Sequence, residues 1–379
     1  MAATKDNVFV VLSLSGGNDG LNTVIPYTNN RYWDYRPTLA VAEDKIIPIS
    51  DELGFYPTMA PLKQFWDEGK LAIFLGIGYP HPSYSHFRSM DIWHTCEPDK
   101  VGIDGWLGRA IKDIDPTAEN VLTGVNFGRG LPRALAKEGV PVASVGNLET
   151  YGLLTGIEGQ DQRTQALDVF ARMYNPTVGR GYVLDYIRRT GTDALKGADI
   201  LATAPSKYTS QVTYSNTAVG QYMKNIVQTN LANFGTRILY TTSPYNGFDT
   251  HANQAVNHHN LWTDVSNNVK TFFDDLRQHQ ASDNVLLFMF SEFGRRIADN
   301  GSGTDHGAAG VAFAAGEKVK GGLYGVYPSL EPSQQEEGGN LKFTMDFRSV
   351  YATILEDWMG LNPGPIVGGN FEQIKFLNN

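Results

Sequence analysis

Five short segments of this 379-residue chain combine acids, histidines or hydroxyls with glycine or proline. They hold Asp19, the turn from Ser83 to His86, Asp249 with His251, Glu292, and Asp305 with His306. Carboxylates and imidazoles without thiols suit Zn, Mn or Mg, and we expect one or two divalent cations, with Ca as a further choice. A hydroxyl beside such a cation has a lowered pKa and becomes a nucleophile. The pattern therefore indicates metal-assisted hydrolysis, in which two cations would clamp a phosphoryl or sulfuryl group.

Asp19 and the serines each have a structural interpretation as well. Asp19 either binds a metal or merely caps the element that follows it. Ser85 either attacks a substrate or caps the helix that begins after it, because serine is a preferred capping residue. Asp249 with His251, and Asp305 with His306, lie in irregular or glycine-rich sequence, where packing explains them less well.

Histidine placement agrees with a shared site. Seven of the eight histidines lie in or near these segments, and only His279 lies elsewhere. His86 and His94 are eight residues apart on one expected helix, about 12 Å along its axis, so they cannot bind the same ion. We expect His94 to be a packed or surface residue, and one of His258 and His259 to be a solvated helix residue.

Short apolar runs predict the strands that would position these segments. They cover Val8–Leu14, Leu71–Ile77, Asn120–Phe127, Val140–Val145, Arg237–Thr241, Asn284–Phe290, Val311–Ala315 and Gly322–Tyr327. In an open α/β sheet, ligands bind beyond the carboxyl ends of the strands. The acids and histidines should therefore meet at one edge of a single sheet.

Apolar residues at helical spacing predict helices between the strands. They cover Pro57–Trp66, Tyr84–Thr95, Gly105–Ile114, Gln160 to about Ala204, Ala218–Phe234, a long helix that follows Gly247–Gln254, and Phe347–Met359. Tyr32–Ile49 is expected to be a covering loop with a short strand at Lys45–Ile49. Because no linker or repeat is visible, we predict one α/β domain over 1–379 with a helical insertion around 155–235.

Composition excludes several classes of function. The net charge of −9, without a run of Lys and Arg, argues against a nucleic-acid binder. No run of about 20 apolar residues predicts a membrane span, and no signal peptide is visible. Cys96 is the only cysteine, so no internal disulfide is expected. The segment from Cys96 to Lys100 approaches the signature of formylglycine sulfatases but lacks its final arginine. GGNDG lacks the spacing of a dinucleotide-binding loop.

Six motifs, SLSGGNDGLNTVIPY, YSHFRSMDIW, GWLGR, GFDTHANQ, SEFGRR and GTDHG, occur in this order from about Val8 to Trp358. In these motifs the chain closely resembles the bacterial domain-of-unknown-function family 1501 (DUF1501), which is usually placed in the alkaline phosphatase and sulfatase superfamily. The resemblance implies a three-layer αβα sandwich about a mostly parallel sheet, alkaline-phosphatase-like, with a two-metal site. It also implies a periplasmic or extracellular location, since family members are commonly exported.

Carried over by motif, the resemblance assigns roles to the candidate residues. Asp19 resembles the metal ligand after the first strand, and Ser85, or Ser83 instead, the nucleophile at a helix start. The two metal sites would use Asp249, His251, His306 and Glu292, with Asp305 as a further candidate ligand. Phe293 stands where the superfamily has a histidine, and the Asp249 to His251 spacing is shorter than usual, so the second metal site is in question.

The favoured function is a metal-dependent hydrolase of phosphate or sulfate esters, with an anionic ester or glycan as substrate. Arg88 and Arg295 are candidates to bind the anion, because a guanidinium offers a planar fork of donors. His86 would orient Ser85 or protonate the leaving group. The alternatives are a catalytically altered scaffold that acts as an extracellular binding or assembly protein, and a metal-dependent lyase or isomerase. The oligomeric state is left open.

Overall fold

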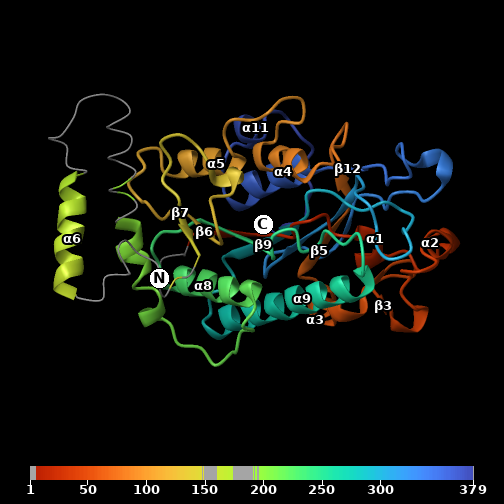
Figure 1. Ribbon diagram of the computed structural model, residues 1–379, viewed down its shortest axis with the longest axis horizontal. Helices are drawn as coiled ribbons and strands as arrows, with labels where there is room; N and C mark the ends of the chain where they lie inside the picture. Colours follow the sequence, from red (N-terminus) through yellow and green to blue (C-terminus); the bar gives the residue numbers. More distant parts are fainter. Residues whose placement is uncertain are drawn as a thin grey trace.

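A nine-stranded sheet runs through the molecule in this computed structural model, which describes residues 6–146, 148, 160–173, 191, 193 and 196–378 (Figure 1). The strand order is β11-β5-β10-β9-β1-β8-β6-β7, and β12 pairs with β5. The strands are β1 Val8–Ser13, β5 Leu71–Gly78, β6 Gly124–Phe127, β7 Ala143–Val145, β8 Ile238–Thr242, β9 Val285–Phe290, β10 Gly310–Ala315, β11 Gly322–Tyr324 and β12 Met345–Asp346. All eight strand predictions therefore correspond to strands of this sheet.

Most pairings in the sheet are parallel. β1 lies between β8 and β9 and pairs in parallel with both. β6 runs parallel to β7 and β8, and β5 runs parallel to β11 and β12. β10 is antiparallel to its neighbours β5 and β9. The predicted α/β class with a mostly parallel sheet is confirmed.

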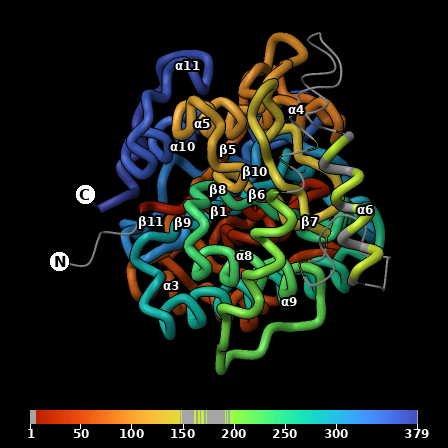
Figure 2. Tube along the Cα trace, turned by 90° about the vertical axis from the view of Figure 1, so that its left-hand side faces the viewer, coloured from red at the N-terminus to blue at the C-terminus, as the bar shows by residue number. Residues whose placement is uncertain are grey.

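Helices cover both faces of the sheet and make three layers (Figure 2). One face carries α3 Ala60–Asp67, α8 Ala218–Ala232 and α9 Gln254–Gln278; the other carries α4 His86–Thr95, α5 Trp106–Ile114, α10 Phe347–Thr353 and α11 Pro363–Val367. Strand β1 shows why both faces are covered. Its alternate residues Val8, Val10 and Leu12 belong to one apolar core, and Phe9 and Val11 belong to the other.

Shorter elements complete the described chain. They are α1 Gly20–Thr23, α2 Asn30–Tyr35, α6 Gln160–Met173, a small sheet of β2 Val24–Ile25, β4 Gly54–Phe55 and β3 Ile47–Pro48, 3₁₀ turns at Glu43–Lys45, Pro57–Met59, Arg133–Leu135, Pro205–Lys207 and Pro332–Gln334, and a π turn at Ile354–Trp358. The covering segment predicted as a loop contains most of α2, which Asn29 caps by accepting from Arg31. Part of the predicted insertion around 155–235 lies outside the described residues. The single domain stays a prediction.

The carboxyl edge of the sheet brings the chemically interesting loops together. Gly16, just after β1, has φ +118°, and a Cβ there would lie 2.4 Å from the backbone nitrogen of Asp249. Only glycine allows this close approach of the loops that follow β1 and β8. Within the described chain, no helix combines the length and the apolar character that a membrane crossing requires.

Candidate metal centre

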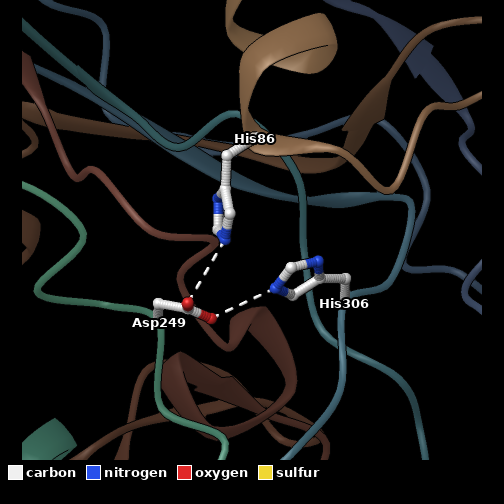
Figure 3. Close-up of side chains that lie close together, drawn as sticks. All are labelled: His86, Asp249 and His306. Atoms are coloured by element: carbon white, nitrogen blue, oxygen red, sulfur yellow. Dashed lines mark hydrogen bonds and ion pairs between the residues drawn. The ribbon is translucent and has the colours of Figure 1, made fainter.

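Two histidines and one aspartate, His86, His306 and Asp249, meet at this edge (Figure 3), and His251 lies against Asp249 and His306. His86 is the first residue of α4, beyond β5, and Asp249 and His251 lie between β8 and α9. His306 lies between β9 and β10, opposite Arg295 in a short antiparallel bridge. We call these four side chains the imidazole cluster. They come from three separate loops, so the cluster exists only in the folded chain.

One nitrogen of each ring faces the same carboxylate. His86 Nε2 lies 3.3 Å from Asp249 Oδ2, and His306 Nε2 lies 3.1 Å from Asp249 Oδ1 (Figure 3). His251 Nε2 lies 3.0 Å from Asp249 Oδ1 and 2.9 Å from His306 Nε2. The three imidazoles therefore converge on Asp249.

The opposite nitrogen of each ring contacts an oxygen. His86 Nδ1 lies 2.8 Å from Glu292 Oε1, and His306 Nδ1 lies 2.7 Å from the carbonyl oxygen of Tyr84. His251 Nδ1 lies 3.2 Å from Asp305 Oδ1. A carbonyl or carboxylate oxygen only accepts, so in the form that could bind a cation each neutral ring would carry its proton on Nδ1.

That form would leave an Nε2 lone pair on each ring beside Asp249, whereas in the other tautomer Nε2 of His306 donates to Asp249 Oδ1, at 3.1 Å. His251 Nε2 and His306 Nε2 lie 2.9 Å apart, close enough to bind one cation when both present lone pairs. His86 Nε2 is buried and makes no hydrogen bond, although Asp249 is close. Imidazoles held by an oxygen at the far nitrogen are the usual form of histidine metal ligands.

The donor set fits a divalent cation. Ligand atoms of His86, Asp249 and His306 all lie within 4.8 Å of one another. His251 adds a third imidazole from the solvent side, where its side chain is 45% exposed. Two imidazole nitrogens and one carboxylate oxygen, which leave a coordination position open, form the kind of set that binds Zn²⁺ at catalytic sites in proteins. The residues present therefore fit a metal ion.

Charges around the cluster keep Asp249 ionised. Burial raises the pKa of Asp249, but the hydrogen bond and charge of Arg295, with His306 and His251, outweigh burial and lower it to about 2. The hydrogen bond to Glu292 raises the pKa of His86. Burial lowers the pKa of His306. A cation would thus meet a carboxylate that is already charged.

Glu292 and Asp305, which the sequence suggested as metal ligands, lie behind the histidines instead. Glu292 is buried, and the backbone N–H of Gly16 donates to both of its oxygens, at 2.9 and 3.1 Å. Its Oε1 also faces His86, as Asp305 Oδ1 faces His251. Because both oxygens of Glu292 already have partners, we correct its assignment from ligand to support of a ligand. Asp305 Oδ1 supports His251, whereas Asp305 Oδ2 makes no hydrogen bond among the described residues, so Asp305 as a ligand stays a prediction.

Asp19 lies outside the cluster, in contrast to the expectation. Arg36 donates to both oxygens of Asp19, at 2.5 and 2.9 Å, and Gln254 donates to Oδ2 at 2.5 Å. Asp19 also caps α1, where its Oδ1 accepts from Asn22 at 3.4 Å. The capping interpretation describes this residue, and no oxygen of Asp19 is left for a metal.

The two arginines suggested for anion binding are occupied. Arg295 is fully buried and donates to Asp249 and to the carbonyl oxygens of the residues 16, 17, 248 and 304. Arg88 points along α4 and donates to Asp91 and to the carbonyl oxygens of the residues 97 and 98. Both assignments are corrected, because neither guanidinium presents a free fork to a substrate.

Ser85 precedes His86 and occupies the N-cap position of α4, but its hydroxyl makes no capping hydrogen bond. It is exposed, and its backbone N–H donates to Ser83 Oγ at 3.3 Å. The Ser83 hydroxyl therefore has a partner, whereas the Ser85 hydroxyl makes no hydrogen bond among the described residues. Of the two serines, Ser85 is the better placed beside the cluster.

His86 as a member of the cluster was not anticipated, since the sequence suggested a proton-transfer role for it. The signal was present, because His86 begins a helix directly beyond a strand. The carbonyl of Tyr84 carries no signal in the sequence. Phe293 packs against two imidazoles, its ring centre 4.9 Å from those of both His86 and His306. His94 is packed against Tyr240, as expected.

Comparisons with known proteins place the chain among relatives. A family model described as "Protein of unknown function (DUF1501)" matches residues 133–367. A comparison with curated proteins finds no match. The fold is similar to that of the PsFucS1 sulfatase from Pseudoalteromonas sp., at 12% identity and a TM-score of 0.42, over 98% of this chain and 71% of that one.

Two further solved structures are similar at the same level. Ps i-CgsB, in complex with k-i-k-neocarrahexaose, is 11% identical with a TM-score of 0.38, over 97% of this chain and 73% of that one. The alkaline phosphatase PafA, in a variant form, is 8% identical with a TM-score of 0.37, over 78% of this chain and 64% of that one.

Proposed function

The chain belongs to the DUF1501 family, and from this premise we propose that its imidazole cluster binds one divalent cation and hydrolyses phosphate or sulfate esters. The convergence of three imidazole Nε2 atoms on the carboxylate of Asp249 carries the proposal. His86, His251, His306 and Asp249 would hold the ion. A cation held there supplies Lewis-acid stabilisation of the charge that develops on the ester oxygens.

We propose one ion rather than two. A second site would have to use Asp19, Glu292 or Asp305, the other carboxylates suggested as ligands, and Asp305 lies on the exposed side with Oδ1 facing His251. Asp19 is bound by Arg36 and Gln254, and Glu292 by Gly16 and His86. Phe293 adds an apolar ring beside His86 and His306. These contacts support a mononuclear centre.

Ser85 is the proposed nucleophile. Its oxygen would bond to phosphorus or sulfur while the bond to the ester oxygen breaks and the alcohol leaves with a proton. Water would then release the phosphate or sulfate from Ser85. Glu292 contributes by fixing the ring of His86, the residue next to Ser85, at the start of α4. The anionic substrate and a location outside the cytoplasm are parts of the same proposal.

The test measures metal content and ester hydrolysis together. Purified protein should contain about one divalent ion per chain and should hydrolyse nitrophenyl phosphate or nitrophenyl sulfate. Ser85→Ala should lose activity by at least about a thousandfold with its metal content unchanged, since loss of a nucleophile has effects of that size or larger. Ser83→Ala is the matched control and should keep most of the activity. Protein with neither metal nor esterase activity would overturn the proposal.

A second candidate function is a binding or assembly protein built on the same scaffold. The observation that favours it is Phe293, which places an apolar ring against two of the imidazoles. Protein that binds the metal stoichiometrically but hydrolyses neither ester would favour this candidate over the hydrolase.

A further inference from the structure

The site has no obvious cationic group for an anionic substrate once Arg88 and Arg295 are excluded. Arg295 is fully buried, and its donors go to backbone oxygens and Asp249. A substrate oxygen needs a donor that is exposed and uncommitted. The next residue in the chain, Arg296, meets both conditions.

Arg296 combines a fixed backbone with a free side chain. Its N–H donates to the carbonyl of Asp305 at 3.0 Å, and its own carbonyl accepts from Arg36 at 3.0 Å. Its side chain is 49% exposed. The closest carboxylate oxygen in the described chain is Asp305 Oδ2, at 3.9 Å, beyond hydrogen-bond distance. The guanidinium thus lies near Asp305 without forming a hydrogen bond to it.

Asp305 lies on the solvent-exposed side of the imidazole cluster. Asp305 faces Arg296 with one oxygen and His251 with the other. His251 is the most exposed histidine of the cluster. The charge of Arg296 also acts on the hydroxyl of Tyr84, whose carbonyl holds His306. Arg296 therefore shares Asp305 with His251, on the exposed side of the cluster.

We infer that Arg296 binds the anionic oxygens of the substrate and so selects for charged esters. This inference rests on the proposed function, because it names the group that holds the phosphate or sulfate at the same site. A guanidinium presents two parallel N–H donors, which match two oxygens of a phosphate or sulfate. Binding the anion would exchange a loose ion pair with Asp305 for charge-assisted hydrogen bonds.

The experiment measures binding of inorganic phosphate and inorganic sulfate by calorimetry, with and without bound zinc. Arg296→Gln should weaken binding of the anion about tenfold or more, and Arg296→Lys should weaken it less, because lysine keeps the charge but not the fork. Arg172→Gln is the matched control. Arg172 is an exposed arginine that pairs with Asp168 on α6, and its replacement should change the affinity less than twofold.

Zinc content, measured on the same samples, separates this inference from the proposed function. Arg296→Gln protein with full zinc and wild-type anion affinity would overturn the inference and leave the metal centre standing. So would zinc-loaded wild-type protein that binds neither anion. If the wild type binds no zinc, the proposed function fails, yet loss of anion binding in Arg296→Gln alone would still support the inference. A fall in kcat/KM for charged but not neutral nitrophenyl esters would support it further.

Discussion

Two aspartates that follow the neighbouring strands β1 and β8 each pair with an arginine, and the two pairs differ in what they leave free. Arg36 donates to both oxygens of Asp19, and both side chains are completely buried. Arg295 donates to Oδ1 of Asp249, whose Oδ2 faces an imidazole nitrogen without a hydrogen bond. The Asp19–Arg36 pair leaves no carboxylate oxygen free, and we call it the closed pair. The Asp249–Arg295 pair leaves Oδ2 free, and we call it the open pair.

A carboxylate that stabilises the fold has all of its oxygens paired, whereas one that could bind a cation keeps an oxygen free. Burial raises the pKa of Asp19, but Arg36 and Gln254 outweigh burial and the pKa is lowered. A cation could reach Asp19 only by breaking a buried ion pair, which is strongly unfavourable. Asp249 also has an arginine partner, yet three ring nitrogens face its carboxylate. We expect Asp19 to act on stability and Asp249 on binding.

Removing Arg36 from the closed pair should have the largest effect of the changes considered. Arg36→Met should lower the free energy of unfolding by about 3–5 kcal/mol, because it leaves the charge of Asp19 buried without a partner. Urea unfolding followed by circular dichroism measures the change. Arg31→Met, which removes an exposed ion pair with Glu331, is the control and should cost less than about 1 kcal/mol. Equal losses in the two variants would contradict the contrast.

The second prediction removes one histidine of the imidazole cluster. His86→Ala should weaken binding of zinc about a hundredfold or more, because losing a ligand should exceed the 10–100-fold effect of losing a group that supports one. Because the variant also loses the contacts of the ring with Phe293 and Glu292, urea unfolding checks that it is folded at the temperature of the assay. Competition with a zinc-sensitive dye measures the affinity. His259→Ala on α9 is the matched exposed histidine, and wild-type affinity in both variants would contradict the cluster.

The sequence predicted the sheet well because each strand is buried by its own residues. Val8 to Ser13 is apolar on both faces, so its place at the centre follows from the chain alone. The meeting of Asp249, His251 and His306 at the carboxyl edge follows from the same strands. The convergence of these loops depends on the order of the strands more than on detailed packing, so it could be predicted from the sequence.

The partners of individual side chains were not accessible in this way. Nothing in the motif around Asp19 indicates that Arg36, 17 residues later, takes both of its oxygens. The two arginines of SEFGRR look equivalent in the sequence. The bridge between Arg295 and His306 turns Arg295 inward, where it is fully buried, while the side chain of Arg296 is half exposed. Side-chain direction in such a loop is decided by tertiary pairing.

A third prediction uses pH to probe the buried side of the comparison. His258 is buried near Asp19, and burial lowers its pKa to about 4, although the charge of Asp19 raises it and those of Arg36 and Arg295 lower it. Below the ordinary pKa of 6.5, the unfolded chain takes up a proton that the folded chain refuses. Stability from this group is therefore present above pH 6.5 and is lost as the pH falls towards 4.

When the pH falls from 6.5 to 5.0, His258 should lower the free energy of unfolding by roughly 2 kcal/mol, at about 1.4 kcal/mol for each pH unit, because only the unfolded chain takes up the proton. Urea unfolding at the two pH values measures the loss in the wild type and in His258→Gln. The variant should lose about 2 kcal/mol less than the wild type, whatever its stability at pH 6.5. His259→Gln, at the exposed neighbouring position, should show the wild-type pH dependence. An unchanged pH dependence in His258→Gln would show that this ring titrates normally.

The smallest change is expected when the carboxylate of Asp305, which faces His251, is replaced by an amide. Asp305→Asn keeps the shape of the side chain but weakens the acceptor for Nδ1 of His251, so the ring is held less firmly in its metal-binding tautomer. Because Asp305 is 48% exposed, we expect the low end of the usual range, a roughly tenfold loss of zinc affinity. Dye competition measures it, with Asp299→Asn as the matched control. Asp299 caps the loop at Gly301 and contacts no histidine of the cluster among the described residues. A loss in Asp305→Asn as large as that in His86→Ala would instead place Asp305 among the ligands.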